Sequence, residues 1–286
     1  DWSILNVGMR NWGTDQTYLN LVSYPLKKQP DIVLLMFFAG NDVSDNYRPV
    51  ILKTPWDAPH FIPANGNQVN SFSDLRKVNW SGYQNPFDEP RDFPFPRNIN
   101  AWLRLNSVVY RGIDQARQLI QKKTKNTLKE GHSSDPSKPP QPWGVFRIGD
   151  DPPEWQTAWR ITEILLKEMK IESEKRKAQF MIVVAPFSPL IEPHYVPEDV
   201  KRKDVLNSAK YDLTKPAKHL IEFGKQNNIP VLDLAPGLIE FRKLDPHRKL
   251  FFPKDGHFTA LGNCVVGGLI TNWIDADSNV DFKGCK

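Results

Sequence analysis

The sequence predicts an α/β fold, a three-layer α/β/α sandwich in which a parallel sheet lies between two layers of helices. Short continuous apolar runs occur at residues 32–38 and 179–186, as expected of strands that are buried on both faces of a parallel sheet. Segments with helical spacing of apolar residues alternate with these runs, which is typical of a parallel sheet. The length of 286 residues is sufficient for one large domain.

The elements follow one another as strand, helix, strand, insertion, and then helix, strand, helix, strand, helix. The first strand is expected at residues 3–8, where a short apolar run ends in Gly8 with no lead-in, as if the polypeptide had been cut inside a domain. Thr14 and Asp15 indicate the start of a helix, because Thr and Asp are favoured at helix N-termini. Further helices are expected at 14–29, 154–177, 208–228 (with Pro216 near its start) and from Thr259 onward, and further strands at 32–38, 179–186 and 229–236.

Residues 50–150 are predicted to be an insertion within a single domain that spans residues 1–286. Pro, Asn, Asp and aromatic residues interrupt every periodic pattern between 50 and 97, a helix is expected at 101–123, and 131–144 has the composition of a mobile linker. Tryptophans of this region could stack on sugar rings, or they could pack the insertion onto the sheet; they are Trp56, Trp80, Trp102 and Trp143.

Charge and residue spacing argue against several classes of protein. The balance of 38 Lys+Arg against 33 Asp+Glu is spread thinly, without a basic stripe among aromatics, so no nucleic acid partner is expected. No apolar run approaches the length of a membrane span. Cys264 and Cys285 are too few for a metal site, and they either pair or leave Cys264 as a buried thiol. No histidine pair has zinc-site spacing, so a zinc site is not expected.

Three polar clusters follow predicted strands, at residues 6–16, 39–46 and 253–258. Sites in open α/β sheets collect at the carboxyl ends of strands, so these clusters are expected to converge. In the second cluster, Gly40 permits a tight turn and Asn41 presents an amide that suits an oxyanion hole. The alternative is that Asn41 forms an Asx turn at the start of the next segment.

The third cluster contains a histidine beside a carboxylate. Asp255 could accept a hydrogen bond from Nδ1 of His257 and leave Nε2 free to accept a proton. The alternative is that Asp255 caps the last helix and that His257 is an incidental surface residue.

In this order and spacing, the clusters resemble the motifs of the SGNH hydrolase superfamily, the GDSL-type esterases and lipases. PDIVLLMFFAGNDVSDN (30–46) resembles the Asn block of the family, FPKDGHFTALGN (252–263) its His block, and LNVGMRNWGTDQTYL (5–19) its Gly block. The resemblance covers residues 1–46 and 154–273. It implies a flavodoxin-like sheet from which the first strand is missing, and it says nothing about the insertion.

The resemblance also implies roles for individual residues. His257 with Asp255 would be the catalytic base, and the oxyanion hole would consist of the Asn41 side chain and a backbone N–H near Asn11. Asn11 stands where the family has glycine, and Asp-x-His replaces the Asp-x-x-His of many members. No metal or cofactor is implied, and export of many relatives would place the protein in the periplasm or outside the cell.

The nucleophile of the family is not found. Ser3 lies within the first predicted strand and Ser44 follows the Asn block, and neither stands in a Gly-Asp-Ser context. The resemblance therefore implies a serine esterase, acting on a small-molecule, lipid or O-acetylated glycan ester, whose serine lies outside residues 1–286. An O-acetyltransferase acting on a glycan, and a non-catalytic protein that binds a carbohydrate or another partner, are the alternatives.

Overall fold

A computed structural model describes residues 3–9, 12–26, 28–51, 58–64, 69–78, 143–193, 209–253, 256–276, 282, 284 and 285. These residues belong to one compact unit, which consists of Asp1–Tyr83 and Pro139–Lys286.

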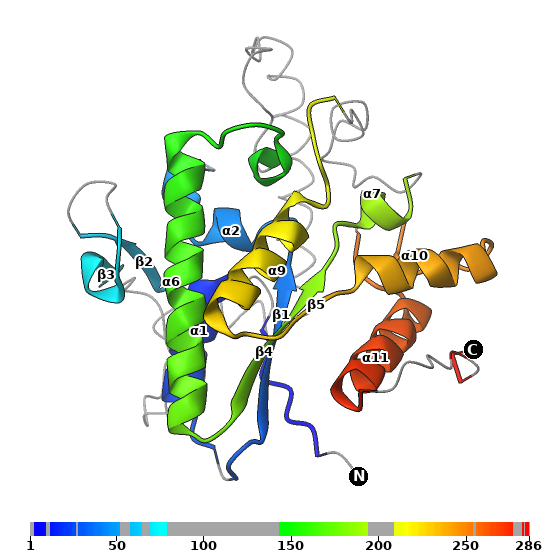
Figure 1. Cartoon of the computed structure of the whole chain (residues 1–286), viewed down its shortest axis with the longest axis horizontal. Helices are drawn as coiled ribbons and strands as arrows, with labels where there is room; N and C mark the ends of the chain where they lie inside the picture. Colours follow the sequence, from blue (N-terminus) through cyan, green and yellow to red (C-terminus); the bar gives the residue numbers. More distant parts are fainter. Residues whose placement is uncertain are drawn as a thin grey trace, which may run out of the picture. The chain divides into compact units, whose positions relative to one another are not determined.

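A parallel sheet of three strands lies at the centre of the described chain (Figure 1). Its strands are β1 (Ile32–Phe38), β4 (Gln179–Ala185) and β5 (Val231–Asp233), in the order β1-β4-β5. Leu35 pairs with Ile182 across the first interface. The apolar runs thus form the parallel strands that the sequence predicts, and the α/β class is confirmed.

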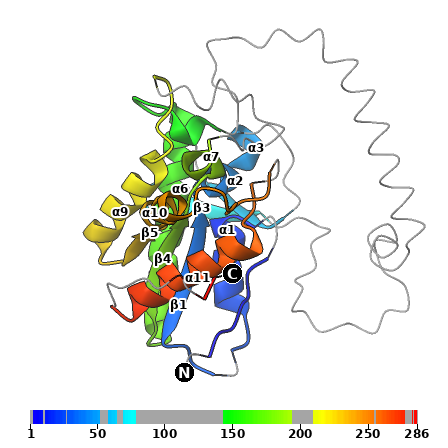
Figure 2. The same ribbon diagram turned by 90° about the vertical axis from the view of Figure 1, so that its right-hand side faces the viewer.

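Each face of the sheet has its own hydrophobic core, because successive side chains of a strand point to opposite faces. Leu35 and Phe37 of β1 belong to one core, and Leu34 and Phe38 contribute to the other. Figures 1 and 2 show helices on both sides of the strands. The first core includes residues of α1 (Thr14–Ser23), α6 (Pro153–Lys175) and α9 (Lys215–Asn227), and the second those of α10 (Ala235–Leu244) and α11 (Ala260–Ile274).

Two helices are shorter than the sequence predicts, and proline is part of the reason. α1 ends at Ser23 because Tyr24 precedes Pro25 and adopts an extended conformation, so the predicted extension to residue 29 is wrong. α9 begins at Lys215 rather than at 208, with Pro216 in its first turn as predicted. Helix α10, directly after β5, was not predicted.

The predicted strand at residues 3–8 is wrong. No residue from 3 to 9 lies in a strand, and a side-chain donor, Asn20 Nδ2, reaches the Val7 carbonyl at 3.3 Å. Ile4 and Leu5 are 87% and 58% exposed. Among the described strands, β1 lies at the sheet edge and pairs only with β4, so residues 3–9 form no ladder with β1.

The first part of the predicted insertion contains regular structure. β2 (His60–Pro63) and β3 (Leu75–Val78) form an antiparallel pair, so the expectation of irregular chain from 50 to 97 is wrong there. The ring of Tyr18 in α1 lies 5.9 Å from Phe61. The short elements are α2 (Asp42–Asp45), α3 (Arg48–Ile51), η1 (Phe72–Asp74), η3 (Trp143–Phe146) and α7 (Ser188–Ile191).

Trp143 is a core residue and not a platform for sugars. It is 8% exposed and its ring stacks on Phe187, with 4.5 Å between ring centroids. The structure therefore favours the packing alternative for this tryptophan. Trp56, Trp80, Trp102, the predicted helix 101–123 and most of the predicted linker lie outside the described residues.

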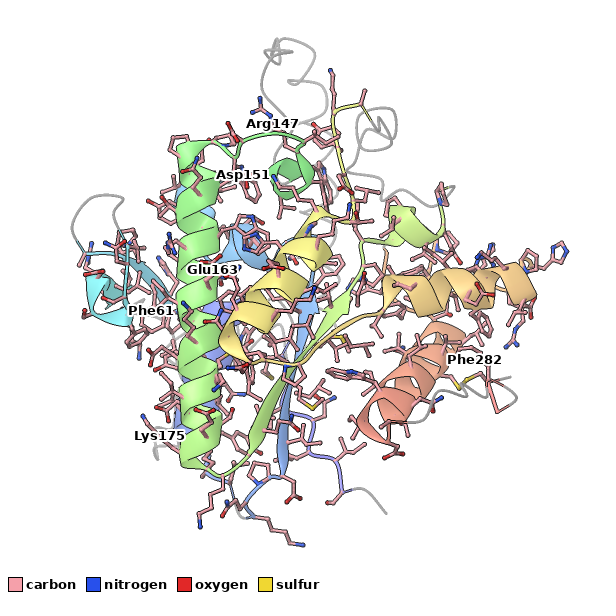
Figure 3. The ribbon with its side chains drawn as sticks, in the orientation of Figure 1. Phe61, Arg147, Asp151, Glu163, Lys175 and Phe282 are labelled. Carbon is pink, nitrogen blue, oxygen red and sulfur yellow. A yellow bond between two sulfur atoms is a disulfide. The ribbon has the colours of Figure 1, made fainter. Side chains whose placement is uncertain are left out.

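The two cysteines, whose state the sequence left open, form a disulfide. Cys264 of α11 is bonded to Cys285, with 5.6 Å between the Cα atoms. Figure 3 shows Phe282 beside α11, close to this bond, and the Phe282 ring lies 5.2 Å from that of Phe241 in α10. Within the ranges that the structure describes, no helix has the length and apolarity that crossing a bilayer requires.

Candidate functional site

Asn41 lies just after the carboxyl end of β1, at the start of α2. Gly40 is needed at this turn, since a Cβ atom there would lie 2.5 Å from the Phe38 ring. The Asn41 side chain makes no capping hydrogen bond to α2. Its Nδ2 donates instead to Oδ2 of Asp45, at 2.8 Å. The Asx-turn alternative therefore does not describe this side chain.

Part of the predicted Gly block packs directly on the predicted Asn block. The backbone N–H of Asp15 donates to Oδ1 of Asn46 at 3.2 Å. Asn46 in turn donates through Nδ2 to Thr162 of α6, at 2.7 Å. The side chains of Asp15, Asp42 and Asp45 are buried in this region. Sequence reasoning missed these three carboxyl groups, although for Asp42 and Asp45 a polar run directly after a buried strand was a usable signal.

Burial dominates the electrostatics of the three carboxyl groups. It raises the pKa of Asp15 and of Asp42 well above the ordinary value, and nearby carboxylates raise both further. Burial also raises the pKa of Asp45, to about 6, against the opposing effect of the Arg48 guanidinium. Arg48 Nη1 lies 2.9 Å from Oδ1 of Asp45. Asp45 is thus the member of the group that has a cationic partner.

His257 lies on a loop whose base is fixed by backbone hydrogen bonds. Thr259 N donates to the Leu250 carbonyl at 2.9 Å, and Phe252 N donates to the carbonyl of His257 itself at 2.8 Å. Gly256 has φ of +74°, a left-handed conformation that favours glycine in this tight loop. The His257 side chain is exposed at the loop surface, just before the Thr259 cap of α11.

A buried carboxylate ties this loop to the carboxyl end of the sheet. Glu192, 2% exposed, accepts a hydrogen bond from Leu250 N at 2.9 Å. It follows α7, which itself follows the carboxyl end of β4. Figures 1 and 2 place α7 and α2 at the same end of the sheet, the end toward which β1 and β4 run. The His257 loop and Asn41 are therefore both attached to the carboxyl end of the sheet.

The other two residues predicted for the site, Asn11 and Asp255, lie outside the described residues. The expected contact between Asp255 and Nδ1 of His257 thus stays a prediction.

No serine described at this end of the sheet offers an exposed hydroxyl. Ser44 is 1% exposed, and its Oγ donates to the Asn41 carbonyl at 2.8 Å. Ser188, at the start of α7, is fully buried. The segment that contains Ser3 begins near the opposite end of the sheet (Figure 1). These three serines are poorly placed to attack a substrate held between Asn41 and His257.

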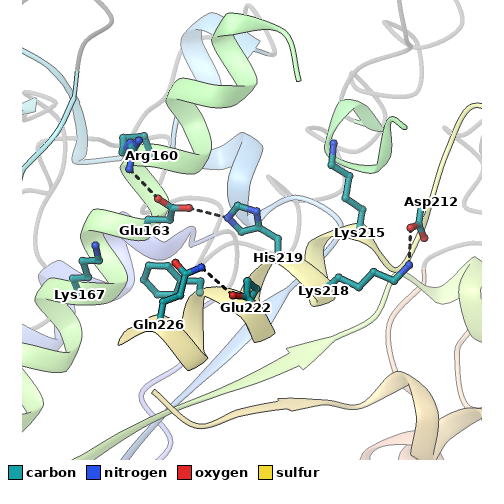
Figure 4. A pocket seen from close by; sticks show the side chains of 10 residues that line it. Arg160, Glu163, Lys167, Asp212, Lys215, Lys218, His219, Glu222 and Gln226 are labelled. Carbon is teal, nitrogen blue, oxygen red and sulfur yellow. Dashed lines mark hydrogen bonds and ion pairs between the residues drawn. The ribbon is translucent and has the colours of Figure 1, made fainter. Parts of the chain in front are cut away.

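A groove of about 470 Å³ lies elsewhere, between α6 and α9 (Figure 4). His219 Nε2 lies 2.9 Å from Glu163 Oε1, and its ring stacks on Trp159 at 4.0 Å. Lys218 pairs with Asp212 at 2.9 Å. The contacts of His219 with Glu163 and Trp159 thus connect α9 to α6 beside this groove. In the part of the chain covered here, no group of His, Cys, Asp and Glu side chains could hold a metal ion.

Comparison with protein-family models, with curated proteins and with solved structures finds no match to this chain. The case for a function therefore depends on the residues and on their geometry.

Proposed function

We propose that residues 1–286 carry the base and the oxyanion donors of an SGNH-type serine ester hydrolase, with a flavodoxin-like three-layer fold. The observation that carries the proposal is the placement of Asn41 and of the exposed His257 on segments anchored at the same end of the sheet. The carboxyl end of a parallel sheet is where sites of α/β proteins form. The nucleophile in this proposal is a serine from a Gly-Asp-Ser block that these residues do not contain.

The proposed reaction is acyl transfer to water. The serine Oγ attacks the ester carbonyl carbon while Nε2 of His257 takes the hydroxyl proton, which it then gives to the leaving alcohol. Asp255 holds the imidazole through Nδ1–H. The Asn41 amide and a backbone N–H near Asn11 donate to the oxygen that becomes negatively charged. Water, deprotonated by His257, then releases the acid from the acyl-serine.

Hydrolysis of p-nitrophenyl acetate tests this proposal. Residues 1–286 alone should show no turnover above background, whereas a protein that also supplies the Gly-Asp-Ser block should be active. In that protein His257→Ala should lower kcat by about 10²- to 10⁴-fold, and Asn41→Ala by about 10²- to 10³-fold. His247→Ala is the matched control, since His247 is also exposed and precedes the same loop.

Two results would contradict the proposal. Turnover by residues 1–286 that disappears in His257→Ala would mean that a serine within the chain is the nucleophile. A parent protein that has alanine or glycine in place of this serine, and shows no turnover, would exclude the hydrolase and favour a binding protein on the same fold.

A further inference from the structure

We propose that Asp45 is a positioning residue that orients the Asn41 amide for the oxyanion, and that Arg48 offsets its charge. This inference rests on the proposed function, since it concerns a donor of the same site. It assigns a role to two residues that the residue pattern alone did not single out.

The geometry fixes Asn41 at two points. Asn41 Nδ2 donates to Oδ2 of Asp45 at 2.8 Å, and the Asp45 backbone N–H donates back to the Asn41 carbonyl, also at 2.8 Å. Ser44 Oγ donates to that same carbonyl. Asp45 is 2% exposed, so water does not compete freely for its carboxylate. The Asn41 backbone and side chain are thus held by neighbouring residues of one short helix.

A carboxylate is the group that selects the orientation of an amide. An ionised carboxylate only accepts hydrogen bonds, so Nδ2 and not Oδ1 of Asn41 must face Asp45. The amide nitrogen carries two N–H groups. With one of them committed to Asp45, the second is held in a defined direction and is available to a substrate oxygen. A neutral amide at position 45 could accept or donate, and it would lose this selection.

The negative charge of Asp45 would by itself oppose an oxyanion nearby. Arg48 Nη1 donates to Oδ1 of Asp45 at 2.9 Å, on the oxygen that Asn41 does not use. The pair places a positive charge next to the carboxylate, which reduces its repulsion of charge that develops on the substrate. Oδ2 of Asp45 therefore orients the Asn41 amide, and Oδ1 pairs with Arg48.

Asp42 provides a matched control within the same helix. It is also a buried carboxyl group, at 8% exposure, but its Oδ2 accepts from Phe38 N at 2.9 Å. Asp42→Asn retains an oxygen acceptor for this bond and leaves the contact between Asn41 and Asp45 in place. A general effect of losing a buried carboxylate would appear in both variants, whereas an effect on Asn41 would appear only in Asp45→Asn.

The first test is spectroscopic and needs no activity. In the full chain labelled with ¹⁵N-asparagine, one Nδ2 proton of Asn41 should exchange slowly with solvent. Asp45→Asn should speed its exchange by about tenfold or more, the factor that corresponds to losing a hydrogen bond to a charged acceptor. Asp42→Asn and Arg48→Gln should leave it slow. Unchanged exchange in Asp45→Asn would overturn the inference, whether or not the protein proves to be an esterase.

The second test uses p-nitrophenyl acetate and the protein that carries the Gly-Asp-Ser block. Asp45→Asn should lower kcat by about 10- to 100-fold with little change in KM. Arg48→Gln, at a side chain that is 31% exposed and tolerant of change, should lower kcat while the Asn41 proton stays protected. Wild-type kcat in a folded Asp45→Asn variant of an active enzyme would overturn the inference and leave the proposed function intact.

Discussion

At the scale of single residues, Asp15 is a buried carboxyl group with an incomplete set of partners. It is fully buried, and its Oδ2 has no hydrogen-bond partner among the residues that the structure describes. Burial raises its pKa. A raised carboxyl pKa means that the folded chain retains a proton that the unfolded chain releases above about pH 4. The stability that this group contributes is therefore present below the unfolded pKa and is lost as pH rises through the folded one.

Asp15→Asn should remove this loss, because the amide is neutral at every pH. We expect the variant to be more stable than the wild type at pH 8, by about 1.4 kcal/mol for each pKa unit by which folding raises the carboxyl group, with the difference shrinking toward pH 4. Asp45, with a pKa of about 6, should leave a residual decline between pH 4 and 6, and Asp42, whose pKa is also raised, should add to it. Urea denaturation at pH 4, 6 and 8 measures this. The exposed Asp31→Asn should follow the wild type, and a parallel profile for Asp15→Asn would contradict the account.

What the sequence reveals at this scale depends on distance along the chain. Asn41 could be found because it follows an apolar run, and its contact with Asp45 spans only four residues. The bond between Glu192 and Leu250 spans 58 residues. No local pattern predicts that contact, because tertiary packing decides which loop meets the end of β4. The sequence thus identified His257 without identifying what holds its loop.

At the scale of elements, α11 fixes the His257 loop by a close backbone approach. A Cβ atom on Gly262 would lie 2.1 Å from the Leu250 carbonyl oxygen. Backbone cannot move aside as a flexible side chain can, so Gly262→Ala should lower the free energy of unfolding by about 1–3 kcal/mol. Gly267→Ala, on the same helix with nothing within 4 Å, should instead raise it by about 0.5–1 kcal/mol. Urea denaturation compares the two, and equal effects would contradict the close approach.

The disulfide should hold the C-terminal segment on α10 and α11. It closes a separation of 21 residues, and Arg248 Nη1 also donates to the Cys285 carbonyl at 3.1 Å. Replacing both cysteines by serine should cost about 3 kcal/mol, by the chain-entropy account of such a loop. Thermal unfolding with and without reductant measures the loss, and the double variant should not respond to reductant. A wild type that is insensitive to full reduction would contradict this role.

The boundaries of the elements show why patterns of apolar residues predict only part of the fold. Runs of apolar residues predicted β1 and β4 to within a residue or so, because burial on both faces demands them. The same kind of run at residues 3–8 does not form a strand, and Ile4 and Leu5 within it are exposed, so an apolar run alone does not specify a strand in a sheet. Helix α10 was missed because the turn after β5 is short and the apolar run continues into the helix.

At the scale of the whole molecule, the sheet ends at β1 in the described chain and leaves apolar surface exposed. Met36, in the middle of β1, is 43% exposed, and its side chain points to the same face as Leu34 and Phe38. Ile4 and Leu5 add further exposed apolar surface. An open strand edge with apolar side chains promotes pairing between chains. The proposed function expects a serine-bearing strand at this edge, so the same surface should behave differently with and without that strand.

Met36→Lys tests the edge of β1 both without a neighbouring strand and with one. In residues 1–286 alone we expect concentration-dependent association, followed by light scattering, and we expect the lysine to slow it, because a charge on an edge strand opposes pairing. Ile171→Lys is the matched control, since Ile171 is 41% exposed on α6, away from the sheet edge. In a protein whose serine-bearing strand pairs with β1, side chains of that strand would flank Met36 on the same face of the sheet, and Met36→Lys should then lower the free energy of unfolding, because a charge would be partly removed from water. Equal effects of the two lysines on association, or an unchanged stability of Met36→Lys in the longer protein, would contradict this account of the edge.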